Sequence, residues 1–348
     1  MRRCCKVPAS TLLFVVSAVV GCGERALTEG LVVDSGKSSE VGPVQLATVG
    51  ADESLSDIAV DESGVYFSVA WYPDPLPGGP PGSDTAGAIR RVPREGGDTA
   101  ELWRGQGAAY AVGAGTTAIY FMTYEYASAG RAGYVRSVPR IGGPARTLGT
   151  WSSHGSTIGL AVDRDTVYWG HSAGSGGTLN RTDGLDSTTT ALIPDVSAPV
   201  GLATDGDRVF FVSPDLQSSY GVFGVPAVGG APTPLLERVT NASGALAVSS
   251  PSRTLIASVA DSGVSAIDLS SGSVTALTDA PAGDVATDDA FAYWIDVGGG
   301  RIAKAPITGC CAPTTVASGV TRPVAIAVDD RFVYWADRDA RRVMRAPK

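Results

Sequence analysis

The sequence contains only two histidines, and both are suited to acid–base chemistry. His154 and His171 lie in the third unit of a repeated pattern, and Glu125 lies in the second unit. An imidazole and a carboxylate can exchange protons with a substrate near neutral pH, so these three side chains are candidates for the general acid and base of a lyase or hydrolase. The alternative is that they are inert side chains of surface loops.

A second set of residues favours binding over catalysis. Five aromatic residues stand in or beside loops that break the repeated pattern: Trp71, Tyr72, Tyr124, Tyr126 and Tyr220. Aromatic rings beside a carboxylate such as Glu125 can stack on a sugar or an aromatic ligand and hydrogen-bond its hydroxyl groups. The alternative is a Pro-rich flap, or surface variation without function.

The remaining chemistry is limited to two adjacent cysteines. Cys310 and Cys311 can form a strained vicinal disulfide or stay as two thiols in an exposed turn, and the sequence leaves both alternatives open. No further cysteine completes a ligand set with them, so we expect no metal site. The motifs of nucleotide-binding and zinc-dependent enzymes are absent, and we expect no cofactor.

An internal repeat indicates which elements position these residues. Seven copies of a short pattern align on one position, which we call the aromatic slot and which holds Phe67, Phe121, Trp169, Phe211, Ala257, Trp294 and Trp335. Apolar and polar residues alternate before the slot, which is the period of a β-strand. A turn rich in Asp and Gly separates two such strands in each copy. The mean spacing of about 45 residues is the length of a four-stranded propeller blade.

The ends of the chain predict how the ring closes. The last copy stops at Lys348 after its third strand, and residues 44–47 supply a strand with no blade of its own. We therefore predict an all-β, seven-bladed β-propeller in which the N-terminal strand completes the last blade and leaves no open sheet edge. The fifth copy, with Leu255-Ile256-Ala257, lacks the aromatics; if it is not a blade, the ring is six-bladed.

The predicted ring places the candidate residues on one face. In a propeller, the loops between second and third strands share a face with the connections between successive blades, and that face usually binds ligands. The loops that carry Trp71, Tyr124 and Tyr220 map to it, as do His154 and His171.

Two blades carry a recognisable motif. Val333-Tyr334-Trp335-Ala336-Asp337 and Ala292-Tyr293-Trp294-Ile295-Asp296 resemble the Tyr-Trp-Thr-Asp repeats of YWTD propellers, which form extracellular ligand-binding rings in LDL-receptor-like proteins. The resemblance implies the fold and structural roles for Trp and Asp. It does not extend to receptor-type recognition, because the other blades lack the full motif. The chain is similar in this respect to bacterial β-propeller lipoproteins with YWTD-like repeats.

The N-terminus has the features of an export signal. Residues 1–21 contain Arg2, Arg3 and Lys6, then an apolar run too short to span a bilayer. Val19-Val20-Gly21 before Cys22 resembles a bacterial lipobox, which implies acylation of Cys22. We predict a lipoprotein signal peptide at 1–21, the acylated cysteine and a flexible tether at 22–43, and one propeller domain at 44–348.

The net charge and the predicted lipid anchor together indicate where the protein is located. Removing Arg2, Arg3 and Lys6 with the signal lowers the net charge from −8 to −11. An acidic surface argues against nucleic acid and against electrostatic docking to anionic lipid, so attachment would rest on the acyl chains. Gly23 favours the outer membrane.

We expect an exported, envelope-anchored and monomeric ring that binds a protein or glycan ligand. The alternatives are a lyase or hydrolase around His154, His171 and Glu125, and a structural subunit of an envelope assembly.

Overall fold

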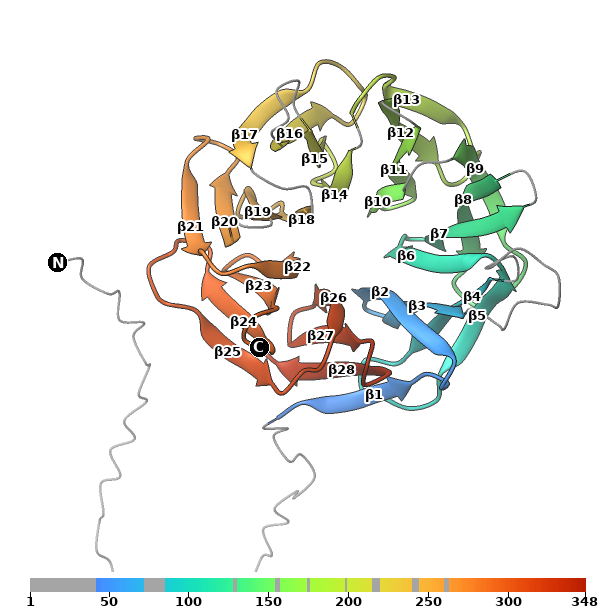
Figure 1. Cartoon of the computed structure of the whole chain (residues 1–348), viewed down its shortest axis with the longest axis horizontal. Coiled ribbons are helices and arrows are strands. Elements are labelled where there is room, and N and C mark those ends of the chain that lie inside the picture. The colour runs from blue at the N-terminus through green and yellow to red at the C-terminus, as the bar shows by residue number, and fades with distance from the viewer. Residues whose placement is uncertain are drawn as a thin grey trace, which may run out of the picture.

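Figure 1 shows a computed structural model of the chain, in which seven β-sheets surround a central axis like the blades of a propeller. The structure describes residues 42–71, 85–127, 130–153, 157–173, 176–197, 199–214, 220–239, 244–259 and 263–348. These residues form 28 β-strands in seven four-stranded sheets and no helix. The chain is a seven-bladed β-propeller, as the repeat predicts.

Each blade contains an inner, a second, a third and an outer strand. The first three blades comprise β2 (Glu53–Asp61), β3 (Gly64–Trp71), β4 (Ala86–Val92) and β5 (Ala100–Gln106); β6 (Ala108–Ala114), β7 (Ala118–Ala127), β8 (Gly130–Pro139) and β9 (Arg146–Ser153); and β10 (Thr157–Asp163), β11 (Thr166–Ala173), β12 (Gly176–Asp183) and β13 (Thr189–Ile193).

The next three blades continue in the same order. They comprise β14 (Val200–Thr204), β15 (Arg208–Pro214), β16 (Tyr220–Pro226) and β17 (Thr233–Val239); β18 (Gly244–Ser249), β19 (Thr254–Val259), β20 (Gly263–Asp268) and β21 (Val274–Thr278); and β22 (Ala282–Thr287), β23 (Phe291–Asp296), β24 (Arg301–Pro306) and β25 (Thr314–Ser318).

The seventh blade joins the two ends of the chain. Its strands are β26 (Pro323–Val328), β27 (Phe332–Asp337), β28 (Arg342–Pro347) and, as the outer strand, β1 (Val44–Thr48). β1 pairs antiparallel with β28, with Val44 opposite Arg345. The predicted closure is confirmed, and opening the ring would require breaking this strand pairing.

The fifth blade is complete despite its weak sequence signal. Strands β18 to β21 form a regular four-stranded sheet, and Ala257 fills the aromatic slot with no solvent exposure. The six-bladed alternative is therefore wrong. Leu255 and Ile256 are also fully buried, so aliphatic packing replaces aromatic packing in this blade.

Neighbouring residues of each second strand pack against different blades. Trp294 packs with Ile256 of the fifth blade, whereas Tyr293 packs with Ile326 and Trp335 of the seventh. Successive side chains of a strand point to opposite faces of its sheet, which explains why apolar residues repeat in pairs here. One such hydrophobic cluster lies at each of the seven blade interfaces.

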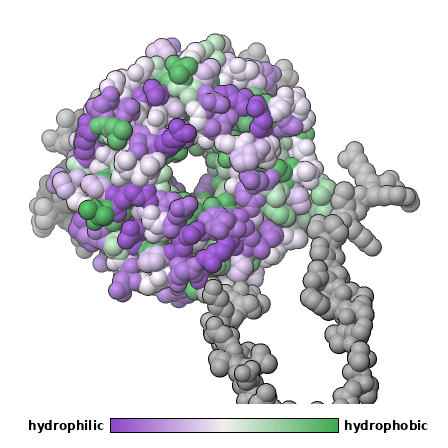
Figure 2. Space-filling model, turned by 180° about the vertical axis from the view of Figure 1, so that it is seen from behind, coloured by the Kyte–Doolittle hydropathy of each residue, from purple (hydrophilic) through white to green (hydrophobic). Residues whose placement is uncertain are grey.

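The seven inner strands surround a central channel. Adjacent inner strands lie against each other around the ring, and the space-filling view in Figure 2 shows an opening at its centre. Two acidic side chains, Asp57 of β2 and Asp284 of β22, stand at equivalent positions of these strands.

Candidate ligand-binding face

Several strands end with an aromatic residue on the same face of the ring. We call this the loop face: it carries the loops between second and third strands and the connections between blades. Tyr124 lies near the end of β7, Trp151 near the end of β9 and His171 near the end of β11, while Tyr110 lies near the start of β6. The topology therefore gathers these rings where blades 2 and 3 meet.

The rings form a continuous set, which we call the aromatic array: Tyr110, Tyr124, Trp151, Trp169 and His171. Tyr110 and Tyr124 are stacked with ring centroids 4.7 Å apart, and Tyr124 meets Trp151 edge-on at 6.0 Å. His171 stacks at 6.1 Å on Trp151 and at 5.9 Å on Trp169. The two indoles are almost fully buried, whereas the other three rings are partly exposed. The array thus has a buried floor and an accessible edge.

Two glycines make room for the indoles. A Cβ atom at Gly133 would lie 2.0 Å from ring atoms of Trp151, and one at Gly149 would lie 2.7 Å from Trp169. Real side chains do not tolerate such distances, so glycine at both positions is a packing requirement. The buried Nε1 of Trp151 has no hydrogen-bond acceptor among the described residues.

His171 is held in place by a hydrogen bond to Thr178. Its Nδ1 lies 2.9 Å from the hydroxyl of Thr178, and that hydroxyl accepts a hydrogen bond from the Asn180 amide at 2.8 Å. The Thr178 hydroxyl donates to Nδ1 or accepts from it, according to which ring nitrogen carries the proton. Burial lowers the pKa of His171, which favours the neutral ring.

Glu125 lies apart from His171. Tyr124 faces blade 3, so the next residue along β7 faces blade 1. There Glu125 pairs with Arg136, whose guanidinium lies over the rings of Tyr134 and Trp103. The structure does not bring Glu125 and His171 together as an acid–base pair, and His154 lies outside the described residues.

The other predicted aromatic residues lie at separate blade interfaces. Trp71 ends β3 and packs against the cluster between blades 7 and 1, with the Arg104 guanidinium 4.5 Å from its ring centroid. Tyr220 begins β16 and packs against the cluster between blades 4 and 5. Tyr72 and the side chain of Tyr126 lie outside the described residues. Of the five, the structure places only Tyr124 in the aromatic array.

Three residues of the aromatic array are not among the binding residues that the sequence predicts: Tyr110, Trp151 and Trp169. Trp169 occupies the aromatic slot, which the repeat explains as structural, and Trp151 lies near the end of an outer strand at a position where the repeat has no tryptophan. The sequence feature that could have indicated the packing of Trp151 is Gly133, which lies opposite it in the strand pair.

The adjacent cysteines lie in an exposed turn between β24 and β25. Their Sγ atoms are 3.5 Å apart, compared with about 2.05 Å in a disulfide, so the bond is not formed in this structure. Cys22 lies outside the described residues.

The carboxylates of the YWTD-like motifs form hydrogen bonds and ion pairs with nearby residues of the same blade or its adjoining loop. Asp337 accepts hydrogen bonds from the amide and hydroxyl of Thr321, at 2.9 and 2.6 Å, and Asp296 pairs with Arg301 at 2.7 Å. Both side chains are buried. Among the described residues, no group of three or more His, Cys, Asp or Glu side chains could hold a metal ion.

The two channel carboxylates have unusual acid–base properties. Asp57 accepts a hydrogen bond from the Val112 amide of the next blade at 2.8 Å, and Asp284 accepts one from the Ile326 amide at 2.9 Å. Burial in the channel wall, together with the charge of Asp284, raises the pKa of Asp57 to about 7. Burial raises the pKa of Asp284 to about 6. Both side chains keep some exposure to the channel.

The fold places the chain among the β-propellers. Solved structures similar to it include a streptogramin B lyase (11% identity, TM-score 0.63, covering 87% of this chain and 96% of that one) and virginiamycin B lyase from Staphylococcus aureus (12%, TM-score 0.64, 88% and 99%). A nidogen/laminin complex contains another (14%, TM-score 0.52, 69% and 94%). At such identities the likeness shows the fold alone.

Comparison of sequences is less informative. No protein family matches the chain, and no curated protein matches it. In the part of the chain that the structure describes, no helix has the length and apolar character of a membrane span.

Proposed function

We propose that this protein is an envelope-anchored binding module that recognises a glycan or protein ligand through the aromatic array on its loop face. The observation that carries the proposal is the stacking of His171 on Trp151 and Trp169 beside the stacked pair Tyr110 and Tyr124. Three partly exposed rings of this array are supported by two buried ones, so the surface can accept a flat sugar face or an aromatic side chain.

The polar groups of the array suit binding better than proton transfer. His171 is hydrogen-bonded to Thr178 through Nδ1 and stacked on two indoles, which fixes its ring as part of a binding surface. Glu125, the proposed partner, is engaged by Arg136 on the other side of blade 2. These observations favour the binding module over the lyase or hydrolase alternative, although some propellers of similar fold are named as lyases.

The anchor is the second element of the proposal. Acylation of Cys22 would tether the ring to the envelope through residues 22–43, and an outer-membrane position agrees with Gly23. The ring itself is acidic and would not bind anionic lipid by charge. Tethering would raise the local concentration of the binding face near envelope ligands.

Binding to a glycan array and to envelope proteins tests the site. The wild-type protein, Tyr124→Ala, His171→Ala and the control Tyr220→Ala would be compared. Tyr220 is also partly exposed on the loop face but lies between blades 4 and 5, so its loss should leave binding intact. We expect the two array variants to lose binding by about tenfold or more each. Equal loss in Tyr220→Ala, or full binding by both array variants, would refute the site.

A further inference from the structure

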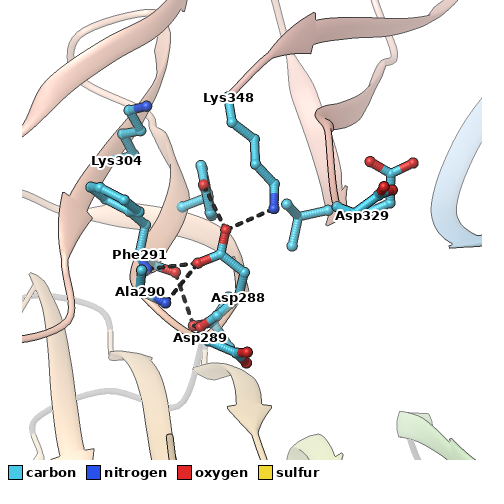
Figure 3. Close-up of a pocket in the computed structure, with 11 residues that line it drawn as sticks. Asp288, Asp289, Ala290, Phe291, Lys304, Asp329 and Lys348 are labelled. Atoms are coloured by element: carbon cyan, nitrogen blue, oxygen red, sulfur yellow. Dashed lines mark hydrogen bonds and ion pairs between the residues drawn. The ribbon is translucent and has the colours of Figure 1, made fainter. Parts of the chain in front are cut away.

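A recess lies between blades 6 and 7 on the face opposite the loop face. Its walls are the turn between β22 and β23, with Asp288 and Asp289, and the turn between β26 and β27, with Asp329 and Asp330. Its volume is about 600 Å³, which is within the range of small-molecule sites. Figure 3 shows Lys304 and Phe291 on one side and Lys348 and Asp329 on the other.

Two of the four carboxylates are already saturated. Asp288 accepts hydrogen bonds from two backbone amides, from the Tyr293 hydroxyl at 2.9 Å and from Lys348 at 2.7 Å. Asp329 has the same arrangement, with Arg94 of blade 1 as its cation. These two carboxylates, with Lys348 and Arg94, tie neighbouring blades together and are already paired with a cation.

The other charged side chains of the recess have fewer hydrogen-bond or ion-pair partners. Lys304 has no ion pair among the described residues, and its Nζ lies 5.1 Å from the centroid of the Phe291 ring. The corresponding residue of the next blade, Arg345, is buried and paired with Glu95 at 2.8 Å. The repeat is therefore broken at Lys304, which leaves a cation at the wall of the recess.

The acidic side of the recess also has unused acceptors. Asp289 receives one hydrogen bond, from Ser249 at 3.0 Å, and Asp330 receives one, from Arg94 at 3.2 Å, with its side chain 74% exposed. Each carboxylate has a second oxygen available for a cationic donor. The recess thus offers two carboxylate oxygens on different blades and one ammonium group, with an aromatic ring beside that ammonium group.

The geometry points to a binding site for a basic amino acid. The α-carboxylate of such a ligand would pair with Lys304, its methylene chain would lie against Phe291, and its two ammonium groups would meet Asp289 and Asp330. A ligand with one negative and two positive charges complements the uncommitted side chains, which are one ammonium group and two carboxylates, better than a plain anion does. This site is independent of the aromatic array and of the function proposed for it.

Titration calorimetry with three probes in low-salt buffer tests the inference. L-lysine carries all three charged groups, cadaverine lacks the carboxylate and L-norleucine lacks the side-chain ammonium. We expect the full-length protein to bind L-lysine about tenfold or more tightly than either of the other two. Equal affinity for the three probes, or no binding of L-lysine, would overturn the proposal.

Variants of the recess test which side chain binds which charged group of L-lysine. Lys304→Met should bind L-lysine no more tightly than cadaverine, Lys304→Arg should retain the preference, and Asp289→Asn should weaken L-lysine toward L-norleucine. The control is Arg164→Gln in the recess between blades 1 and 2, which has about 490 Å³ but no aromatic wall; it should change nothing. Thermal unfolding confirms that each variant is folded. An unchanged preference in folded Lys304→Met would contradict the assignment.

Discussion

The hydroxyl of Tyr334 donates a hydrogen bond of 2.8 Å to Asp329, and Arg94 of the next blade donates to the same carboxylate oxygen at 2.8 Å. Tyr293, Asp288 and Lys348 repeat this arrangement one interface earlier. We call each such set a clasp. Because the clasps flank the blade that joins the two ends of the chain, they reinforce the part of the ring where no covalent connection exists between β28 and β1.

Removal of one clasp hydroxyl should destabilise the ring. Tyr334→Phe keeps the ring packing but leaves Asp329 with one donor fewer in a half-buried site. We expect a loss of about 1 to 2 kcal/mol in the free energy of unfolding, measured by urea denaturation. Tyr220→Phe, outside any clasp, is the control and should change it by less than about 0.5 kcal/mol. Equal stability of the two variants would show that the clasp contributes nothing.

The clasps also predict loss of stability in acid. Burial works to raise the pKa of Asp288, but its hydrogen bonds from Lys348, two amides and Tyr293 hold the pKa below its ordinary value of 3.8. A carboxyl with a depressed folded pKa contributes stability above its unfolded pKa and loses it as pH falls through the folded value. Asp288→Asn should therefore destabilise the protein at pH 7, and the difference from wild type should shrink as the pH falls below 3.8, as followed by thermal unfolding.

The stability that Asp57 contributes should depend on pH in the opposite direction. Its pKa is raised to about 7, so the folded protein holds a proton that the unfolded chain releases at lower pH. Stability from this group is greatest near pH 4 and falls as pH rises through about 7. Asp57→Asn keeps an oxygen for the Val112 amide and removes the charge. We expect Asp57→Asn to raise the free energy of unfolding by roughly 1 kcal/mol at pH 8 and by little at pH 4. The gain at pH 8 is small because the partly exposed charge of Asp57 is screened by solvent. A constant difference between the two pH values would contradict the assignment.

Gly133 should not tolerate a side chain. A Cβ atom there would lie 2.0 Å from the Trp151 ring, so Gly133→Ala must displace the indole. We expect a loss of about 1 to 3 kcal/mol in unfolding free energy and a shift in tryptophan fluorescence. Gly298→Ala is the matched control, because a Cβ atom at Gly298 meets nothing within 4 Å. Unaltered fluorescence in Gly133→Ala would show that the indole lies elsewhere.

The lipid anchor can be tested without knowledge of the ligand. If Cys22 is acylated, Cys22→Ser should abolish labelling with a radioactive fatty acid and release the protein from the membrane fraction. Cys310→Ser serves as the control and should keep both properties, because Cys310 lies in an exposed turn of blade 6. Labelling that persists in Cys22→Ser would exclude the lipoprotein hypothesis.

The sequence was enough to predict the repeat, the strand order and the closure, while the choice between six and seven blades came from the structure. These properties are carried by local patterns: alternating apolar residues, Asp- and Gly-rich turns, and a spare strand at residues 44–47. The fifth blade shows that the pattern survives even where Ala257 replaces the aromatic residue. The strand and turn signals lie within one repeat, and the closure follows from comparing the incomplete last repeat with the spare strand.

Which side chains meet became clear from the packing of the blades. Tyr124 and Glu125 are adjacent in sequence, yet they face different neighbouring blades because alternate residues of a strand point to opposite sides. Trp151 and His171 come from different blades and stack on each other. Residues brought together across a blade interface share no short sequence pattern, and their contacts depend on the packing of sheets that each repeat forms independently.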